Sequence, residues 1–64
     1  MDNKEKFEKA AAQFNNLSTA QKAGAFSYLT GALDLLFEND SISPEKIADA
    51  YLDSVEHAKK YYQK

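Results

Sequence analysis

Apolar residues recur at the spacing of one helix face in three stretches of the chain. No stretch alternates with the period of two that a half-buried strand needs. In the first stretch the apolar residues form a narrow stripe at positions i, i+3, i+4 and i+7: Phe7, Ala10, Ala11 and Phe14. The pattern predicts an all-α fold, a compact three-helix bundle with helices at about residues 3–15, 19–38 and 44–62.

Two polar connectors separate the predicted helices. Ser18 and Gln21 have the spacing of a capping box, in which each side chain bonds the backbone N–H of the other residue. In the second connector Ser43 is the expected N-cap, and Pro44 is the first helical residue, where its missing N–H costs nothing.

The second predicted helix has the broadest apolar surface, roughly half of its circumference or more. We expect it to lie at the centre of the bundle, with the other two helices packed on its two sides. The alternative is that part of the surface is a subunit interface. Each helical glycine costs up to ~1 kcal/mol relative to alanine, which a close approach of another backbone would explain. The residues assigned to this self-association are Gly24, Tyr28, Gly31, Ala32 and Leu35.

The chain has 64 residues, enough for a single helical domain, 1–64, but not for a large core. It has no cysteine and one histidine, so neither a disulfide nor a tight zinc site can add stability. We therefore expect a homodimer. The expected core is the set of apolar residues on the inward helix faces: Phe7, Phe14, Phe26, Leu29, Leu33, Leu36, Phe37, Ile47, Tyr51, Val55 and Tyr62.

The net charge is −2, and all eight basic residues are lysine. Residues 23–56 hold seven carboxylates against one lysine, a net charge of −6. Four of these carboxylates fall within ~80° of one another on the third predicted helix: Glu45, Asp49, Asp53 and Glu56. This acidic stripe is either a solvated face or the partner-binding site for a basic protein.

No constellation of residues supports catalysis. Cysteine is absent, His57 is the only histidine, and there is no phosphate-binding glycine loop or metal-ligand set. We expect no enzyme activity and no catalytic, cofactor-binding or metal site. His57 is interpreted as a partly exposed residue near a helix C-terminus, with a pH-sensing contact as the alternative.

The C-terminal segment interleaves basic and aromatic residues, as in proteins that stack single-stranded nucleic acid: Lys59, Lys60, Tyr61 and Lys64. The competing interpretation is that lysines in a last helical turn simply complement the helix dipole. A small nucleic-acid-associated regulator is therefore an alternative function, and a purely structural homo-oligomer is another.

The leading hypothesis is a small non-enzymatic protein-interaction module, a regulator or inhibitor that binds a larger protein. No apolar run follows residues 1–6, so we expect no membrane span and a cytoplasmic location. Lysine used without arginine is typical of AT-rich genomes and hints at a bacterial or phage source. In size, acidity and helical pattern the chain resembles, in general style only, small accessory proteins of bacteriophages and mobile elements.

We expect no useful binding to duplex DNA, because the chain is acidic and lacks the arginines that read bases and grip phosphates. A fluorescence anisotropy titration at about 150 mM salt checks this, since phosphate contacts are strongly screened there. A sub-micromolar dissociation constant would contradict the prediction.

Overall fold

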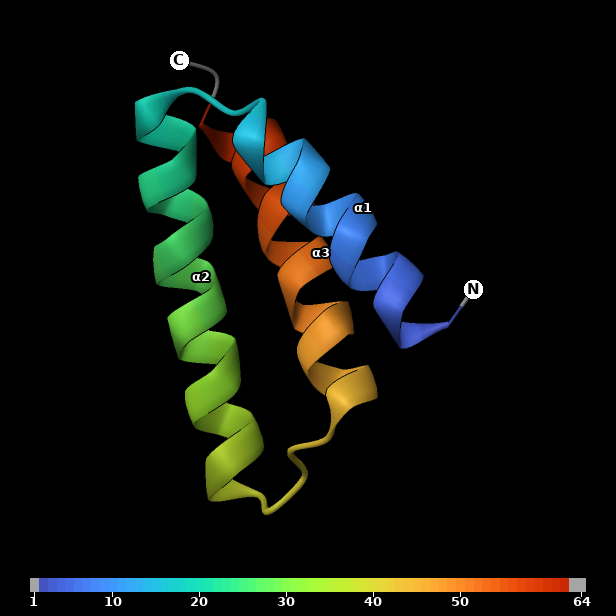
Figure 1. The fold of residues 1–64 in the computed structure, drawn as a ribbon. Coiled ribbons are helices and arrows are strands. Elements are labelled where there is room, and N and C mark those ends of the chain that lie inside the picture. Colours follow the sequence, from blue (N-terminus) through green and yellow to red (C-terminus); the bar gives the residue numbers. More distant parts are fainter. Residues whose placement is uncertain (1, 63–64) are drawn as a thin grey trace.

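The computed structural model describes residues 2–62, and in them the predicted all-α three-helix bundle is confirmed (Figure 1). Helix α1 spans Asn3–Asn15, α2 spans Thr19–Glu38 and α3 spans Pro44–Tyr61. The boundaries agree with the sequence patterns except at the end of α3. Tyr62 there is an extended cap residue rather than the last helical one.

The helix boundaries follow from local hydrogen bonds. The capping box at the start of α2 is complete: the Ser18 hydroxyl accepts from the Gln21 amide at 3.2 Å, and the Gln21 side chain accepts from the Ser18 amide at 2.9 Å. The end of α2 was not marked by a glycine. Asp40 adopts the left-handed conformation instead, with φ of 52°, and the Ser41 amide donates to the Leu36 carbonyl at 2.8 Å. This is the hydrogen bond of a Schellman motif, which closes the helix.

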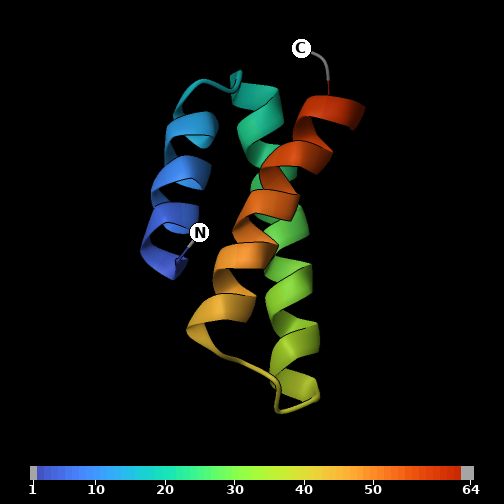
Figure 2. The same ribbon diagram turned by 90° about the vertical axis from the view of Figure 1, so that its right-hand side faces the viewer.

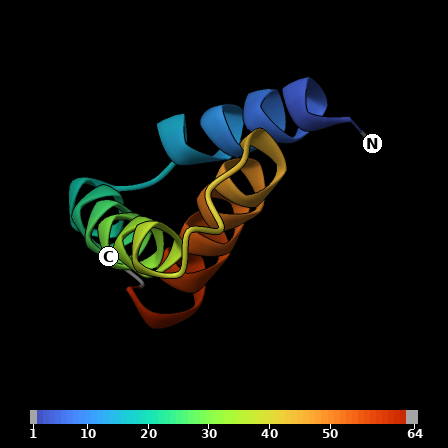
Figure 3. The same cartoon turned by 90° about the horizontal axis from the view of Figure 1, so that it is seen from below.

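The middle helix of the bundle is α3, which corrects the expectation that the second helix is central. Helices α1 and α2 each pack along α3, and they scarcely touch each other. Figures 2 and 3 show the two outer helices on different sides of α3, and the N-terminal end of α1 points away from α2. The principal extents of the molecule are 34 × 25 × 14 Å, so it is flattened in one direction.

Small side chains explain why α3 takes the middle position. Its fully buried residues are all short: Ala48, Ala50, Ser54, Val55 and Ala58. Two neighbouring helices can therefore approach its backbone closely on different sides. The main buried cluster joins α3 to the rest of the chain through Leu17 and Ala25, with Phe14 and Tyr51 packed against it. The wide apolar surface of α2 does not place it at the centre, because its bulky side chains keep neighbouring helices at a distance.

Most of the predicted core is not fully buried, and this too is a correction. Only Val55 is buried completely, whereas Phe26, Phe37 and Tyr62 are 67%, 65% and 42% exposed. The remaining predicted core residues are half-buried: Phe7, Phe14, Leu29, Leu33, Leu36, Ile47 and Tyr51. The physical reason is the position of α1, which lies against α3 and leaves much of α2 uncovered.

We expect Ala58→Leu to destabilise the fold by about 1–3 kcal/mol or more, because extra methylenes at a closely packed site force the helices apart. Ala58 is fully buried in the cluster that joins α2 and α3. The matched control is Ala12→Leu on the exposed side of α1, where we expect a change within about 0.5 kcal/mol. Urea denaturation followed by circular dichroism measures both. Equal urea midpoints for Ala58→Leu and Ala12→Leu would contradict the prediction.

Candidate functional site: two apolar surfaces of α2

Helix α2 presents two separate apolar surfaces, centred roughly 150° apart around its axis. One, which we call the groove, adjoins α3 and is lined on α2 by Tyr28, Gly31, Ala32 and Leu35. The other, which we call the Phe26–Phe37 flank, consists of Phe26, Leu29, Leu33 and Phe37. The sequence pattern merged both into a single broad arc, and the packing of α3 between them divides it.

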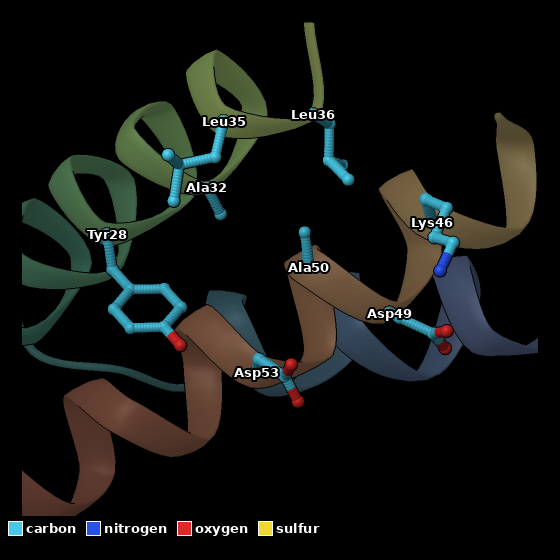
Figure 4. A pocket seen from close by; sticks show the side chains of 8 residues that line it. All are labelled: Tyr28, Ala32, Leu35, Leu36, Lys46, Asp49, Ala50 and Asp53. Carbon is cyan, nitrogen blue, oxygen red and sulfur yellow. The ribbon is translucent and has the colours of Figure 1, made fainter. Parts of the chain in front are cut away.

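The groove lies between α2 and α3 and has an apolar floor (Figure 4). Its hollow between the two helices has a volume of about 320 Å³, and a second hollow of about 380 Å³, lined by α2 residues alone, adjoins it at Tyr28, Ala32 and Leu35. In the close view Ala32 and Ala50 face each other across the floor, and the Leu35 side chain hangs over it from α2. Leu35 is 60% exposed, which is a large exposed fraction for an aliphatic side chain on a helix. Leu36 of α2 and Asp49, Asp53 and Lys46 of α3 also line the hollow between the helices.

The two glycines of α2 have different surroundings. Gly24 is buried, and a Cβ atom there would lie 2.6 Å from the ring of Tyr62. The chain therefore covers Gly24 itself, and this residue is not part of the open surface. At Gly31 an added Cβ would meet nothing within 4 Å. Of the residues assigned to self-association, Tyr28, Gly31, Ala32 and Leu35 come together in the groove, and Gly24 does not join them.

The acidic stripe of α3 is divided between a structural contact and the groove. Asp49 accepts a hydrogen bond from the Lys6 ammonium of α1 at 2.8 Å, so part of its charge is already paired. Asp53 lines the groove and is exposed, and it makes none of the salt bridges found among residues 2–62. Glu45 and Glu56 are exposed but do not line the groove. The stripe therefore contributes Asp49 and Asp53 to this surface.

The Lys6–Asp49 pair also changes the pKa of Lys6. The hydrogen bond to Asp49 raises the pKa of Lys6 above its ordinary value of 10.5, and the nearby charges of Asp49 and Glu45 raise it further. Desolvation acts in the opposite direction and is outweighed. The pair joins α1 to α3 at a point where α2 gives α1 no support.

His57 lies in an aromatic cluster that joins α2 to the end of α3. Its ring stacks on Tyr28, with centroids 4.5 Å apart and planes at 28°. Tyr61 lies on it at 4.7 Å and Tyr62 at 6.2 Å. His57 is half-buried, as interpreted, but it packs between side chains instead of facing only solvent. His57 and Tyr61 are four residues apart on one helix, so their contact follows from the sequence, whereas the stacking on Tyr28 joins distant segments and does not.

The basic and aromatic residues of the C-terminal segment have partners within the chain. Lys59 donates to the Gln13 side chain at 2.8 Å, and the Lys60 ammonium lies 5.5 Å from the ring centre of Tyr61. Lys64 lies outside the described residues. The structure therefore does not gather these residues into one open basic surface.

Comparison of the chain with protein-family models, curated proteins and solved structures gives no match. Within residues 2–62, no three histidine, aspartate or glutamate side chains gather where they could hold a metal ion. The helices of that region include none with the length and apolar character needed to cross a membrane. The functional argument therefore depends on the geometry of the two apolar surfaces.

We expect Lys6→Met to loosen the contact of α1 with α3 at neutral pH and to have less effect at alkaline pH. The pKa of Lys6 is higher in the folded chain than in the unfolded chain. Its contribution to stability is therefore fully present below pH 10.5 and is lost as the pH rises through the raised value.

Thermal melts of the two proteins across the alkaline range measure this difference. The control is Lys9→Met, which removes an exposed lysine of the same helix that makes none of the salt bridges found among residues 2–62. If the difference in melting temperature between wild type and Lys6→Met stays constant through the alkaline range, the prediction that the Lys6–Asp49 pair stabilises the fold is contradicted.

Proposed function

We propose that this chain is a small non-enzymatic protein-interaction module, a regulator or inhibitor that binds a larger protein through the groove between α2 and α3. One observation carries the proposal: an apolar floor open to solvent lies between two helices, beside carboxylates of α3. Exposed apolar patches rimmed by polar groups mark interaction sites in folded proteins. The observation supports binding and gives no indication of chemistry on a substrate.

The dimensions of the groove suit a helix of the partner. From Tyr28 to Leu35 the floor runs along seven residues of α2, or about 10 Å at 1.5 Å per residue. That length accepts about two turns of an amphipathic helix, whose anchors recur at i, i+3 or i+4, and i+7. The open space at Gly31 leaves room for an apolar side chain between Tyr28 and Leu35.

The charge at the edge of the groove favours a basic partner. Asp53 is exposed at the α3 edge, and Asp49 beside it keeps part of its acceptor capacity. Lys46 is the one cation among the groove residues. Lysine or arginine next to the apolar anchors of a partner helix would complement these carboxylates and speed its association. The binding element we propose is thus a basic amphipathic helix on the surface of the larger protein.

The nucleic-acid alternative has less support. It requires Lys59, Lys60 and Tyr61 to be free to grip a strand, but Lys59 is bonded to Gln13 and Tyr61 packs against His57. Carboxylates at the groove would also repel phosphates. We therefore favour a protein partner.

The test uses two synthetic amphipathic helical peptides with the same leucine positions, one with lysine and one with glutamate on the polar side. We expect the lysine peptide to bind, with amide shifts concentrated at Ala32, Leu35 and Ala50 in NMR spectra. We expect the glutamate peptide to bind at least about tenfold more weakly, because like charges meet at the groove. Equal binding of both peptides, or shifts elsewhere, would contradict the proposal.

Matched variants locate the site. Leu35→Asp places a charge in the apolar groove. We therefore expect the dissociation constant of the lysine peptide to rise by about tenfold or more. Phe37→Asp makes a comparable change on the opposite side of α2, where the side chain has a similar exposed fraction. We expect Phe37→Asp to leave peptide binding unchanged. The reverse order of effects would place the site on the Phe26–Phe37 flank.

A further inference from the structure

The Phe26–Phe37 flank is a second apolar surface that the proposed function does not use. Phe26 is 67% exposed and Phe37 is 65% exposed, and Leu29 and Leu33 between them are only half-buried. The flank looks toward α1, because Lys22 on the same side of α2 places its ammonium 5.9 Å from the ring centre of Phe14. Yet α1 scarcely touches α2, so it does not cover the flank.

The apolar surface continues from the flank toward α1. Phe14 packs on the buried cluster together with Tyr51 of α3, and the two ring centres lie 6.2 Å apart. Phe7 lies 6.0 Å from the same tyrosine ring. All three rings are half-buried. The view from below shows α1 and α2 on different sides of α3, with the N-terminal end of α1 directed away from α2 (Figure 3).

We propose that a second copy of this chain covers the flank, so that the protein is a symmetric dimer in which each copy completes the core of the other. The proposal goes beyond the protein-binding function, because it uses the opposite side of α2. Both surfaces can therefore be occupied at once. It also moves the dimer contact away from the groove residues that the sequence favoured.

Charge decides which of the two apolar surfaces can meet its own copy. In a two-fold dimer a surface contacts itself, so a carboxylate in the contact faces its own copy or lies near it. The groove carries Asp49 and Asp53 against the single cation Lys46, so a self-contact there would bring four carboxylates together with only two lysines. On the flank, the α2 positions from Lys22 to Phe37 within about 50° of its centre are four apolar residues and Lys22, which lies at the end of the row. Thr30 and Asp34 lie at the edge beside Phe37. A second copy therefore fits the flank better than the groove.

The exposed phenylalanine rings supply a substantial part of the area that a dimer interface needs. The rings of Phe26 and Phe37 together expose on the order of 250 Å², given that each aromatic side chain can bury about 200 Å². That is roughly a third of the ~800 Å² that each partner contributes to a standard interface. Leu29, Leu33 and the half-buried rings beside them add to it. The whole chain exposes 4427 Å², so such an interface would cover about a fifth of its surface.

Sedimentation equilibrium over about 5–500 μM tests the proposal, a range chosen to span weak and moderate dimer affinities. We expect the wild-type mass to rise to that of a dimer within this range. The double variant Phe26→Ser/Phe37→Ser should remain a monomer, with its dimer dissociation constant raised at least about 100-fold. Both side chains are exposed in the single chain, so circular dichroism of the variant should still show a helical fold.

Leu35→Ser is the matched control, because Leu35 has a similar exposed fraction but lines the groove. We expect it to dimerise like the wild type. A wild-type monomer at all concentrations would overturn the proposal. So would a Leu35→Ser variant that dissociates while the double phenylalanine variant does not. Binding of the lysine peptide to the double phenylalanine variant separates the two proposals, because the groove is unchanged in that protein.

Discussion

The close approach of two helices to the short side chains of α3 determines the rest of this structure. Alanine and serine at its contact positions let α1 and α2 pack on different sides of a single helix. Because α1 and α2 pack on α3 and scarcely on each other, the bundle has a flattened shape. The large side chains of α2 then remain at the surface. The two exposed apolar surfaces are thus a direct result of where the small residues lie.

The sequence was sufficient to predict the elements of the fold and insufficient to predict their packing. Caps such as Ser18 and Ser43 act within a few residues, so their local chemistry marks the helix ends. Which helix takes the centre depends on contacts between distant segments. A wide apolar arc shows only that a helix has apolar surface to bury. Buried alanines such as Ala48 and Ala58 show where the backbones of two helices can approach closely. The positions of those alanines are therefore the sequence signal for the central helix.

The candidate site shows the same division. The spacing of the α3 carboxylates predicts an acidic stripe, and the sequence pattern assigns Tyr28, Ala32 and Leu35 to self-association. The groove that joins Asp53 to Leu35 needed the structure, because it depends on the relative rotation of α2 and α3. The stacking of His57 on Tyr28 likewise depends on tertiary contact alone. The pairing of Lys6 with Asp49 could not be anticipated, since 43 residues separate them.

The contact between Gly24 and the ring of Tyr62 has a consequence for how the sequence can change over evolutionary time. The ring occupies the space that a side chain at position 24 would need. A larger residue at position 24 is therefore compatible with the same packing only if position 62 becomes smaller or its ring turns away. The size of the residue at position 24 therefore limits the size of the residue at position 62, although most of α2 and all of α3 separate them. In diverged descendants of this chain we expect residues 24 and 62 to vary together.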